Sequence, residues 1–282
     1  MSTPPRLRSV LFAPGNRPEI LAKLPRSAPD LAVIDWEDAV PATAKDEARM
    51  ATAAAVAELA AAAPSMGLAV RMNAPDTEHF AADVAALPEG LAAVLVPMLE
   101  SADQAAQVHD ALVAAGRDVG VVAGIETAAG VEFAPATLAA PGVVAAYFGA
   151  EDFVVDVGGV RTTSNVEVLY ARSRLVLAGR LARVAVVDQV VADFRDDDRF
   201  RAEAADARAM GFAGKLCIHP AQVALANAAF SPSEAEVARA AAMLAAYDAA
   251  VAEGRASIAF EGQMVDEPVA RQARAVLARA AD

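Results

Sequence analysis

The chain has 282 residues, with 24 Lys or Arg against 37 Asp or Glu, which gives a formal net charge of −13 at pH 7. This acidic balance argues against a nucleic-acid partner, because phosphate binding requires a basic surface. The single cysteine excludes a disulfide framework within the chain, and no apolar run reaches the roughly 20 residues of a membrane span. Only a short apolar stretch precedes Pro14 and Gly15, so we expect no signal peptide and a cytoplasmic protein.

Short runs of apolar, β-branched residues alternate with longer Ala-rich stretches. Near-continuous apolar runs are typical of parallel strands that are covered on both faces. We predict strands at Ser9–Phe12, Leu31–Trp36, Leu68–Met72, Ala93–Val96, Val119–Ile125, Val143–Phe148, Ala185–Val191 and Lys215–Ile218. The helices predicted between them include Thr43–Ala63, Ser101–Ala115, Val166–Arg183 and Arg199–Met210.

This alternation predicts βα units and a parallel sheet. The number of predicted strands favours a (β/α)8 TIM barrel over a doubly wound open sheet, since no Gly-x-Gly-x-x-Gly follows the first strand. We assign residues 1–222 to the barrel. Residues 223–282 exceed what the eighth unit needs, so we expect a C-terminal helical extension of the same domain. This extension either covers the barrel mouth or reaches a neighbouring subunit.

Acidic residues follow several of the predicted strands, and barrel enzymes place reactive groups where their strands end. The acidic side chains in question are Asp35, Glu37 and Asp38 at the second strand, Glu126 at the fifth, Glu151 and Asp152 at the sixth and Asp188 within the seventh. Carboxylates that converge at one barrel rim repel one another unless a cation lies among them. Because the ligands would be oxygens, the expected cation is Mg²⁺ rather than Zn²⁺.

Each candidate also has a structural interpretation. Glu126 and Asp152 are the predicted Mg²⁺ ligands, and the alternative for both is that they cap a helix. Glu37 and Asp38 either hold metal-bound water or belong to a solvated loop. Asp35 lies within its strand, which is typical of a buried structural acid.

Arg71 lies between Val70 and Met72, where a packed strand favours an aliphatic residue. It is either an ion-pair partner of the acids or a clamp for a substrate carboxylate. His219 is either a structural or a catalytic histidine, and Cys217, within an apolar run, is expected to be a small buried residue.

Several segments together resemble the citrate lyase β-subunit-like (CitE-like) family of the HpcH/HpaI aldolase/citrate lyase superfamily. They are Arg8–Gly15, Asp35–Val40 with Lys45 and Arg49, Arg71–Asn73, Gly124–Thr127, Gly149–Asp152, Ile218–Pro220 and Phe260–Asp266. The resemblance runs along essentially the whole chain, and the family includes citryl-CoA, malyl-CoA and citramalyl-CoA lyases. It implies a (β/α)8 barrel that forms a homotrimer or homohexamer and holds Mg²⁺ through Glu126 and Asp152.

The implied reaction cleaves the carbon–carbon bond of a 3-hydroxyacyl thioester, giving an oxo acid such as oxaloacetate and acetyl-CoA. The resemblance implies that Arg71 binds the substrate acid and that Asp266 exchanges a proton with the acetyl carbon, in family members from a neighbouring subunit. Backbone amides at Gly149, Ala150 and Glu151 are expected to bind another carboxylate oxygen.

One motif departs from the family pattern. Pro97 is a predicted substrate contact, but Met98 follows it where the family commonly has Lys, so the expected cation is missing there. Other activities remain open on the same scaffold: a malyl-CoA thioesterase, or a malate synthase-type condensing enzyme. A further alternative is the β subunit of a citrate lyase complex, which acts on an acyl-carrier thioester with α and γ subunits.

Overall fold

A computed structural model describes residues 6–281. Residues 1–5, which belong to the segment where no signal peptide is expected, and residue 282 lie outside the described part. The chain divides into two compact units, Met1–Asn227 and Ala228–Asp282. The boundary that we expected between residues 222 and 223 and the observed one both fall within α10 (Pro220–Phe230).

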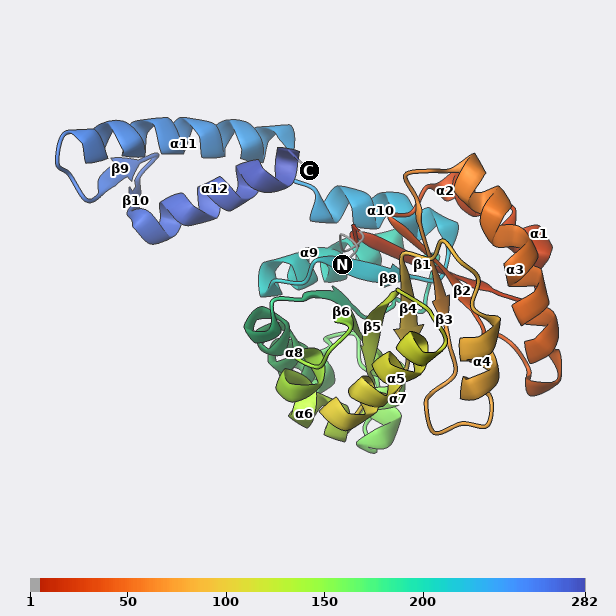
Figure 1. The fold of residues 1–282 in the computed structure, drawn as a ribbon. Helices are drawn as coiled ribbons and strands as arrows, with labels where there is room; N and C mark the ends of the chain where they lie inside the picture. The colour runs from red at the N-terminus through yellow and green to blue at the C-terminus, as the bar shows by residue number, and fades with distance from the viewer. Residues whose placement is uncertain (1–5, 282) are drawn as a thin grey trace. The chain divides into compact units, whose positions relative to one another are not determined.

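The first unit is a closed barrel in which eight parallel strands follow one another in chain order (Figure 1). The strands are β1 (Ser9–Pro14), β2 (Leu31–Asp35), β3 (Gly67–Arg71), β4 (Ala93–Val96), β5 (Gly120–Ile125), β6 (Val143–Phe148), β7 (Ala185–Asp188) and β8 (Gly214–Cys217). β8 closes the barrel by pairing with β1, with Lys215 opposite Ser9. The predicted (β/α)8 barrel is therefore confirmed.

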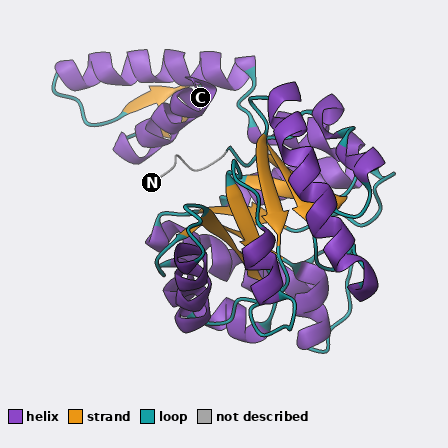
Figure 2. Ribbon diagram, turned by 45° about the vertical axis from the view of Figure 1, so that its right-hand side comes forward, coloured by secondary structure: helices purple, strands orange, loops and turns teal. Residues whose placement is uncertain are grey.

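Helices surround the strands of this unit (Figure 2). They are α1 (Pro18–Leu21), α2 (Leu24–Ser27), α3 (Lys45–Ala62), α4 (Phe80–Ala86), α5 (Ala102–Ala114), α6 (Ala128–Leu138), α7 (Ala150–Asp156), α8 (Leu169–Ala182), α9 (Asp197–Met210) and α10, with short 3₁₀ turns η1 (Ala42–Ala44) and η2 (Val166–Val168). The ends follow local capping chemistry. The Ser101 side chain accepts from the Gln104 amide at the start of α5, and Asp196 accepts from the Arg199 amide at the start of α9.

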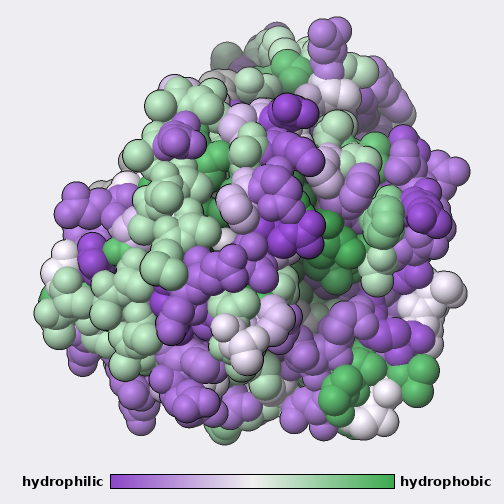
Figure 3. Space-filling model, turned by 90° about the vertical axis from the view of Figure 1, so that its right-hand side faces the viewer, coloured by the Kyte–Doolittle hydropathy of each residue, from purple (hydrophilic) through white to green (hydrophobic). Residues whose placement is uncertain are grey.

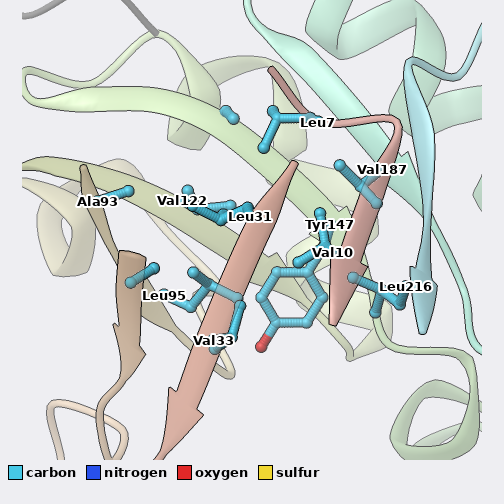
Figure 4. Close-up of a cluster of buried hydrophobic side chains, with 12 residues drawn as sticks. Leu7, Val10, Leu31, Val33, Ala93, Leu95, Val122, Tyr147, Val187 and Leu216 are labelled. Carbon is cyan, nitrogen blue, oxygen red and sulfur yellow. The ribbon is translucent and has the colours of Figure 1, made fainter. Parts of the chain in front are cut away.

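Aliphatic side chains fill the barrel interior, because alternate strand residues point to the same face. The buried cluster includes Val10, Leu31, Val33, Leu95 and Leu216, together with one tyrosine, Tyr147 (Figure 4). In Figure 4 the Tyr147 hydroxyl lies at the end of its ring that faces in the direction in which the strand arrows run. A polar atom of the interior thus faces the carboxyl ends of the strands.

The seventh strand is shorter than predicted. It ends at Asp188, three residues before Val191, and the Asp188 carboxylate is fully buried. Arg172 of α8 and Lys215 of β8 form ion pairs with it at 2.9 and 2.8 Å. Asp188 therefore belongs to the packing between the strands and α8, and not to the barrel mouth.

The second unit contains α11 (Glu234–Ala252) and α12 (Glu267–Ala281), which pack through Met243, Leu244 and Tyr247 of α11 and Ala270 and Ala273 of α12. The helical character that the sequence predicts for this region is present. A two-stranded antiparallel sheet, β9 (Ile258–Phe260) and β10 (Gln263–Val265), was not predicted. Its turn places Glu261 and Gly262 at positive φ of 49° and 78°, a conformation that glycine adopts readily.

Hydrophilic residues share the face drawn in Figure 3 with weakly hydrophobic, pale green ones, as expected of an alanine-rich chain. Among the described residues no helix combines the length and the apolar character that crossing a membrane requires.

Candidate active site

A cavity of about 480 Å³ opens at the carboxyl ends of the barrel strands. Asp35, Phe12 and Tyr147 contribute to its wall from β2, β1 and β6. Most of the predicted site residues line it as well: Asp38, Arg71, Glu126, Gly149, Ala150, Glu151 and Asp152. The structure thus brings together residues that are more than 100 positions apart in the sequence, from Asp38 to Asp152.

Glu126 follows β5 directly and is 4% exposed. Its Oε2 accepts a hydrogen bond of 3.0 Å from the Met98 amide. A Cβ at position 149 would collide with the Glu126 carboxyl group, so the glycine lets this side chain lie against the start of α7. The capping alternative for Glu126 is wrong, because Thr127 caps α6 by accepting from the Gly130 amide at 3.0 Å.

The Pro97–Met98 segment supports Glu126 through its backbone. Met98 has a positive φ of 56° and offers its amide to the carboxylate, a role that does not depend on the side chain. Met98 brings no charge to the rim, but the hydrogen bond from its amide is kept. Pro97 is buried and does not line the cavity, which corrects its prediction as a substrate contact.

Asp152 lies in the first turn of α7 and is exposed toward the cavity. The N-cap of this helix is Gly149 with no side-chain cap, so the capping alternative for Asp152 is also wrong. The Gly149 amide donates to the Ile125 carbonyl at 3.1 Å, and we therefore correct its assignment as a substrate donor. Glu151 pairs with Arg161 at 3.0 Å, so its carboxylate faces a partner within the chain.

Arg71 lies among three carboxylates. Its Nε and Nη2 donate to the two oxygens of Asp35 at 2.8 and 2.6 Å. Its Nη1 is 2.8 Å from Glu37 Oε2 and 3.8 Å from Asp38 Oδ2. The structure therefore shows Arg71 in ion pairs with these acids, and its role as a clamp for a substrate carboxylate stays a prediction. Asp35, which is 1% exposed, is a buried acid as predicted.

The acids at the mouth are destabilised in their charged forms. Burial raises the pKa of Glu37 to about 8 and that of Glu126 to about 7, although the Arg71 charge opposes both shifts. Partial burial and the nearby Asp38 raise the pKa of Asp152. A divalent cation among these groups would favour their ionised forms.

The donor set fits a hard divalent cation. Glu126 and Asp152 offer only carboxylate oxygens, and Gly149 leaves room for the Glu126 carboxyl group. Mg²⁺ commonly takes one or two protein carboxylates and keeps several waters. Within residues 6–281 no three His, Cys, Asp or Glu side chains form a ligand cluster.

Hydrogen bonds to backbone carbonyls hold the loop after β2. Lys45 Nζ donates to the carbonyls of Trp36 and Glu37 at 2.8 and 3.0 Å. The Asn73 amide group donates to Trp36 at 3.2 Å and to Asp83 at 2.7 Å. These contacts fix the backbone from which Glu37 reaches Arg71.

The remaining predicted residues lie elsewhere. Asp266 belongs to the second unit, where its Oδ1 accepts from the Val269 amide at 3.3 Å in the first turn of α12. His219 stacks on Phe194 with ring centroids 4.8 Å apart, and its Nδ1 accepts from the Ala221 amide. Cys217 is buried as predicted, and burial raises its pKa to about 12.

Sequence reasoning missed Tyr147. Its signal was one hydroxyl-bearing side chain in an otherwise apolar segment, Val143–Phe148, opposite Gly124 on the neighbouring strand. The pairing of these two residues depends on the register of β5 and β6, which the sequence pattern alone does not reveal.

Known proteins share this architecture. The family model described as HpcH/HpaI aldolase/citrate lyase matches residues 8–220. The chain is 51% identical over 284 residues to a citrate lyase subunit beta-like protein of Deinococcus radiodurans, with 100% of each chain covered. It is 36% identical over 306 residues to an L-malyl-CoA/beta-methylmalyl-CoA lyase of Rhodobacter capsulatus, with 98% of this chain and 96% of the relative covered. A solved structure of CitE from Mycobacterium tuberculosis with magnesium, acetoacetate and coenzyme A has a TM-score of 0.83 and 33% identity, covering 98% of this chain and 100% of that one.

Proposed function

Because this chain belongs to the HpcH/HpaI aldolase/citrate lyase family, we propose that it is a Mg²⁺-dependent carbon–carbon lyase. Its substrate is a 3-hydroxyacyl thioester with a second carboxylate, of the citryl-CoA, malyl-CoA or citramalyl-CoA type. The products are an oxo acid such as oxaloacetate and a thioester such as acetyl-CoA. The observation that carries this proposal is the cavity in which Glu126 and Asp152 converge beside Arg71.

In this proposal Glu126 and Asp152 hold the cation, and Glu37 and Asp38 bind the water around it. Bound Mg²⁺ supplies a Lewis acid that polarises substrate oxygens and offsets their negative charge. Glu126 is fixed for this task by the Met98 amide at 3.0 Å and by contact with Gly149. Asp152, on α7, approaches from the neighbouring strand–helix connection.

Arg71 orients the carboxylate of the substrate. Two of its N–H groups are committed to Asp35 and one of Nη1 faces Glu37 at 2.8 Å, so substrate binding uses the N–H groups of Nη1 and Nη2 that neither acid takes. The amides of Ala150 and Glu151, at the start of α7, are the proposed donors to a further carboxylate oxygen. Such a fixed arrangement aligns the bond that breaks.

As the carbon–carbon bond breaks, the substrate hydroxyl becomes the carbonyl of the oxo acid and gives its proton to water in the cavity. Asp266 is the proposed donor of a proton to the acetyl carbon, which receives the electron pair of the broken bond. We propose that it acts from a neighbouring subunit in a homotrimer or homohexamer, and that the enzyme acts in the cytoplasm. Mixing inactive Asp266→Asn and Glu126→Gln proteins and letting the subunits exchange tests this role. Regained activity supports sharing of the site between subunits, whereas persistent inactivity in mixed oligomers contradicts it.

The same cavity also suits a malyl-CoA thioesterase or a malate synthase-type condensing enzyme, and a β subunit that acts on a carrier-bound thioester beside α and γ subunits. Free thiol release distinguishes hydrolysis from cleavage. Co-purification with other chains distinguishes a complex subunit from a stand-alone lyase.

The metal site is tested by Glu126→Gln and Asp152→Asn, which remove a charge with little change in shape. We expect each variant to lose Mg²⁺ binding in calorimetry and to lose turnover. Glu132→Gln and Asp206→Asn are matched controls, because these exposed carboxylates lie outside the cavity lining. Unchanged Mg²⁺ binding and turnover in both site variants would show that the proposal is wrong.

A further inference from the structure

The Tyr147 hydroxyl is a buried polar group with no hydrogen bond of normal geometry, although it lies close enough to Glu126 to interact with its carboxyl group. Tyr147 is 1% exposed, and its hydroxyl forms no hydrogen bond of normal geometry with any described residue. It nevertheless lines the same cavity as Glu126 and Arg71. Buried hydroxyl groups are rarely left without a hydrogen bond. We therefore expect this hydroxyl to reach an acceptor once the cavity is occupied.

The position of the hydroxyl follows from the pairing of β5 and β6. Tyr147 lies opposite Gly124, and a Cβ at Gly124 would come within 2.5 Å of the Tyr147 hydroxyl and 2.8 Å of the Pro97 Cα. The missing side chain of Gly124 therefore makes room for the phenol. Glu126 lies two residues further along the chain, and side chains two apart on a strand point to the same face.

Two backbone groups already lie against the Glu126 carboxyl group. The Met98 amide donates to Oε2, and Gly149 lies against the side that carries Oε1. The Tyr147 ring lies in the barrel interior among the core side chains (Figure 4), and Tyr147 and Glu126 line the same cavity.

We propose that the Tyr147 hydroxyl donates a hydrogen bond to the Glu126 carboxylate when the cation binds, which makes Tyr147 a positioning residue for that ligand. The inference rests on the proposed function, because it takes Glu126 as a Mg²⁺ ligand. An ionised carboxylate accepts several hydrogen bonds, and a donor behind a ligand sets its orientation. The Met98 amide and the Tyr147 hydroxyl would then hold Glu126 from two directions.

The substitution Tyr147→Phe tests this role, since it removes one oxygen and keeps the ring that packs in the core. The matched control is Tyr170→Phe, because Tyr170 is 69% exposed on α8. We expect the dissociation constant for Mg²⁺, measured by calorimetry without substrate, to rise about 10- to 100-fold in Tyr147→Phe. The control should bind like the wild type.

A spectroscopic signature reports on the hydrogen bond itself. The chain has only three tyrosines, so Mg²⁺-induced changes in the near-ultraviolet tyrosine band can be assigned by substitution. We expect a red shift in the wild type and in Tyr170→Phe, and none in Tyr147→Phe. A purely structural role of the phenol would change the urea unfolding midpoint without producing this signal.

Two results would overturn the inference while leaving the proposed function intact. One is wild-type Mg²⁺ affinity in Tyr147→Phe. The other is unchanged Mg²⁺ affinity with weaker binding of oxaloacetate at saturating Mg²⁺, which would place the hydroxyl on the substrate. A wild-type protein that binds no Mg²⁺ would instead overturn the inference together with the proposed function.

Discussion

Arg71 of β3 and Asp35 of β2 form a two-bonded ion pair at the wall of the cavity, with N–O distances of 2.8 and 2.6 Å. The parallel register places the two residues opposite each other. The guanidinium is thus oriented by the fold before any substrate arrives. Its remaining N–H groups face the acids that surround the proposed cation.

Substitution of Arg71 should show how much the Arg71–Asp35 ion pair stabilises the barrel. Arg71→Met leaves Asp35 buried without its partner, which typically costs about 3–5 kcal/mol. We expect the free energy of unfolding in urea to fall by about that amount. In the double variant with Asp35→Asn, part of the loss should be recovered. Purely additive losses would contradict direct coupling of the two residues.

A substitution at Gly149 tests how the proposed metal ligand Glu126 packs. Gly149→Ala places a methyl group where the Glu126 carboxyl group lies, so we expect Mg²⁺ affinity and turnover to fall about tenfold or more. Gly159→Ala is the control, because a Cβ there meets only ordinary contacts at 3.4–3.6 Å. Equal Mg²⁺ affinity in both variants would contradict the proposed position of Glu126 as a ligand.

Mg²⁺ binding should depend on pH. The pKa of Glu126 is raised from 4.5 to about 7 in the metal-free protein, so the cation must displace a proton at lower pH. We expect the affinity to be about tenfold weaker at about pH 6 than at about pH 8. Calorimetry in buffers of different ionisation enthalpy measures the released proton. Absence of proton release near neutral pH would contradict Glu126 as a ligand.

The buried ion pair between Lys215 of β8 and Asp188 of β7 should contribute to stability without affecting the candidate active site. Lys215 and Asp188 are both fully buried and 2.8 Å apart. Lys215→Met is expected to lower the free energy of unfolding by about 3–5 kcal/mol with no change in Mg²⁺ affinity. Arg201→Met is the control, because Arg201 pairs only with exposed acids of the same helix and should have little effect. A Lys215→Met protein as stable as the wild type would show that this network is dispensable.

The sequence predicted the barrel well because most residues of each strand are apolar, on both faces of the sheet. Ala93–Val96 and Val143–Phe148 were predicted with the bounds that the structure shows. The end of β7 was missed, since Gln189 is followed by two valines that extend the apolar run beyond Asp188. The β9–β10 hairpin has strands of three residues, too short for an alternating pattern to be visible.

The sequence predicts those residues of the candidate site that directly follow the ends of strands. Glu126 and Asp152 follow adjacent strands, so their convergence follows from a parallel barrel. The sequence does not reveal which acids pair with Arg71, because this depends on the register of β2 and β3. In the same way, the proximity of Tyr147 to Glu126 depends on the register of β5 and β6 and on the missing side chain of Gly124.

The central claim is tested most directly by an oxo-acid assay with the purified protein and Mg²⁺. Citryl-CoA, malyl-CoA and citramalyl-CoA are offered in parallel, with and without EDTA, and a thiol reagent follows free coenzyme A. We predict EDTA-sensitive release of oxaloacetate, glyoxylate or pyruvate from at least one of them, without a matching amount of free thiol. Thiol release without any oxo acid would contradict a lyase and indicate a thioesterase. No oxo acid from any of the three, together with no Mg²⁺ binding, would contradict the whole account.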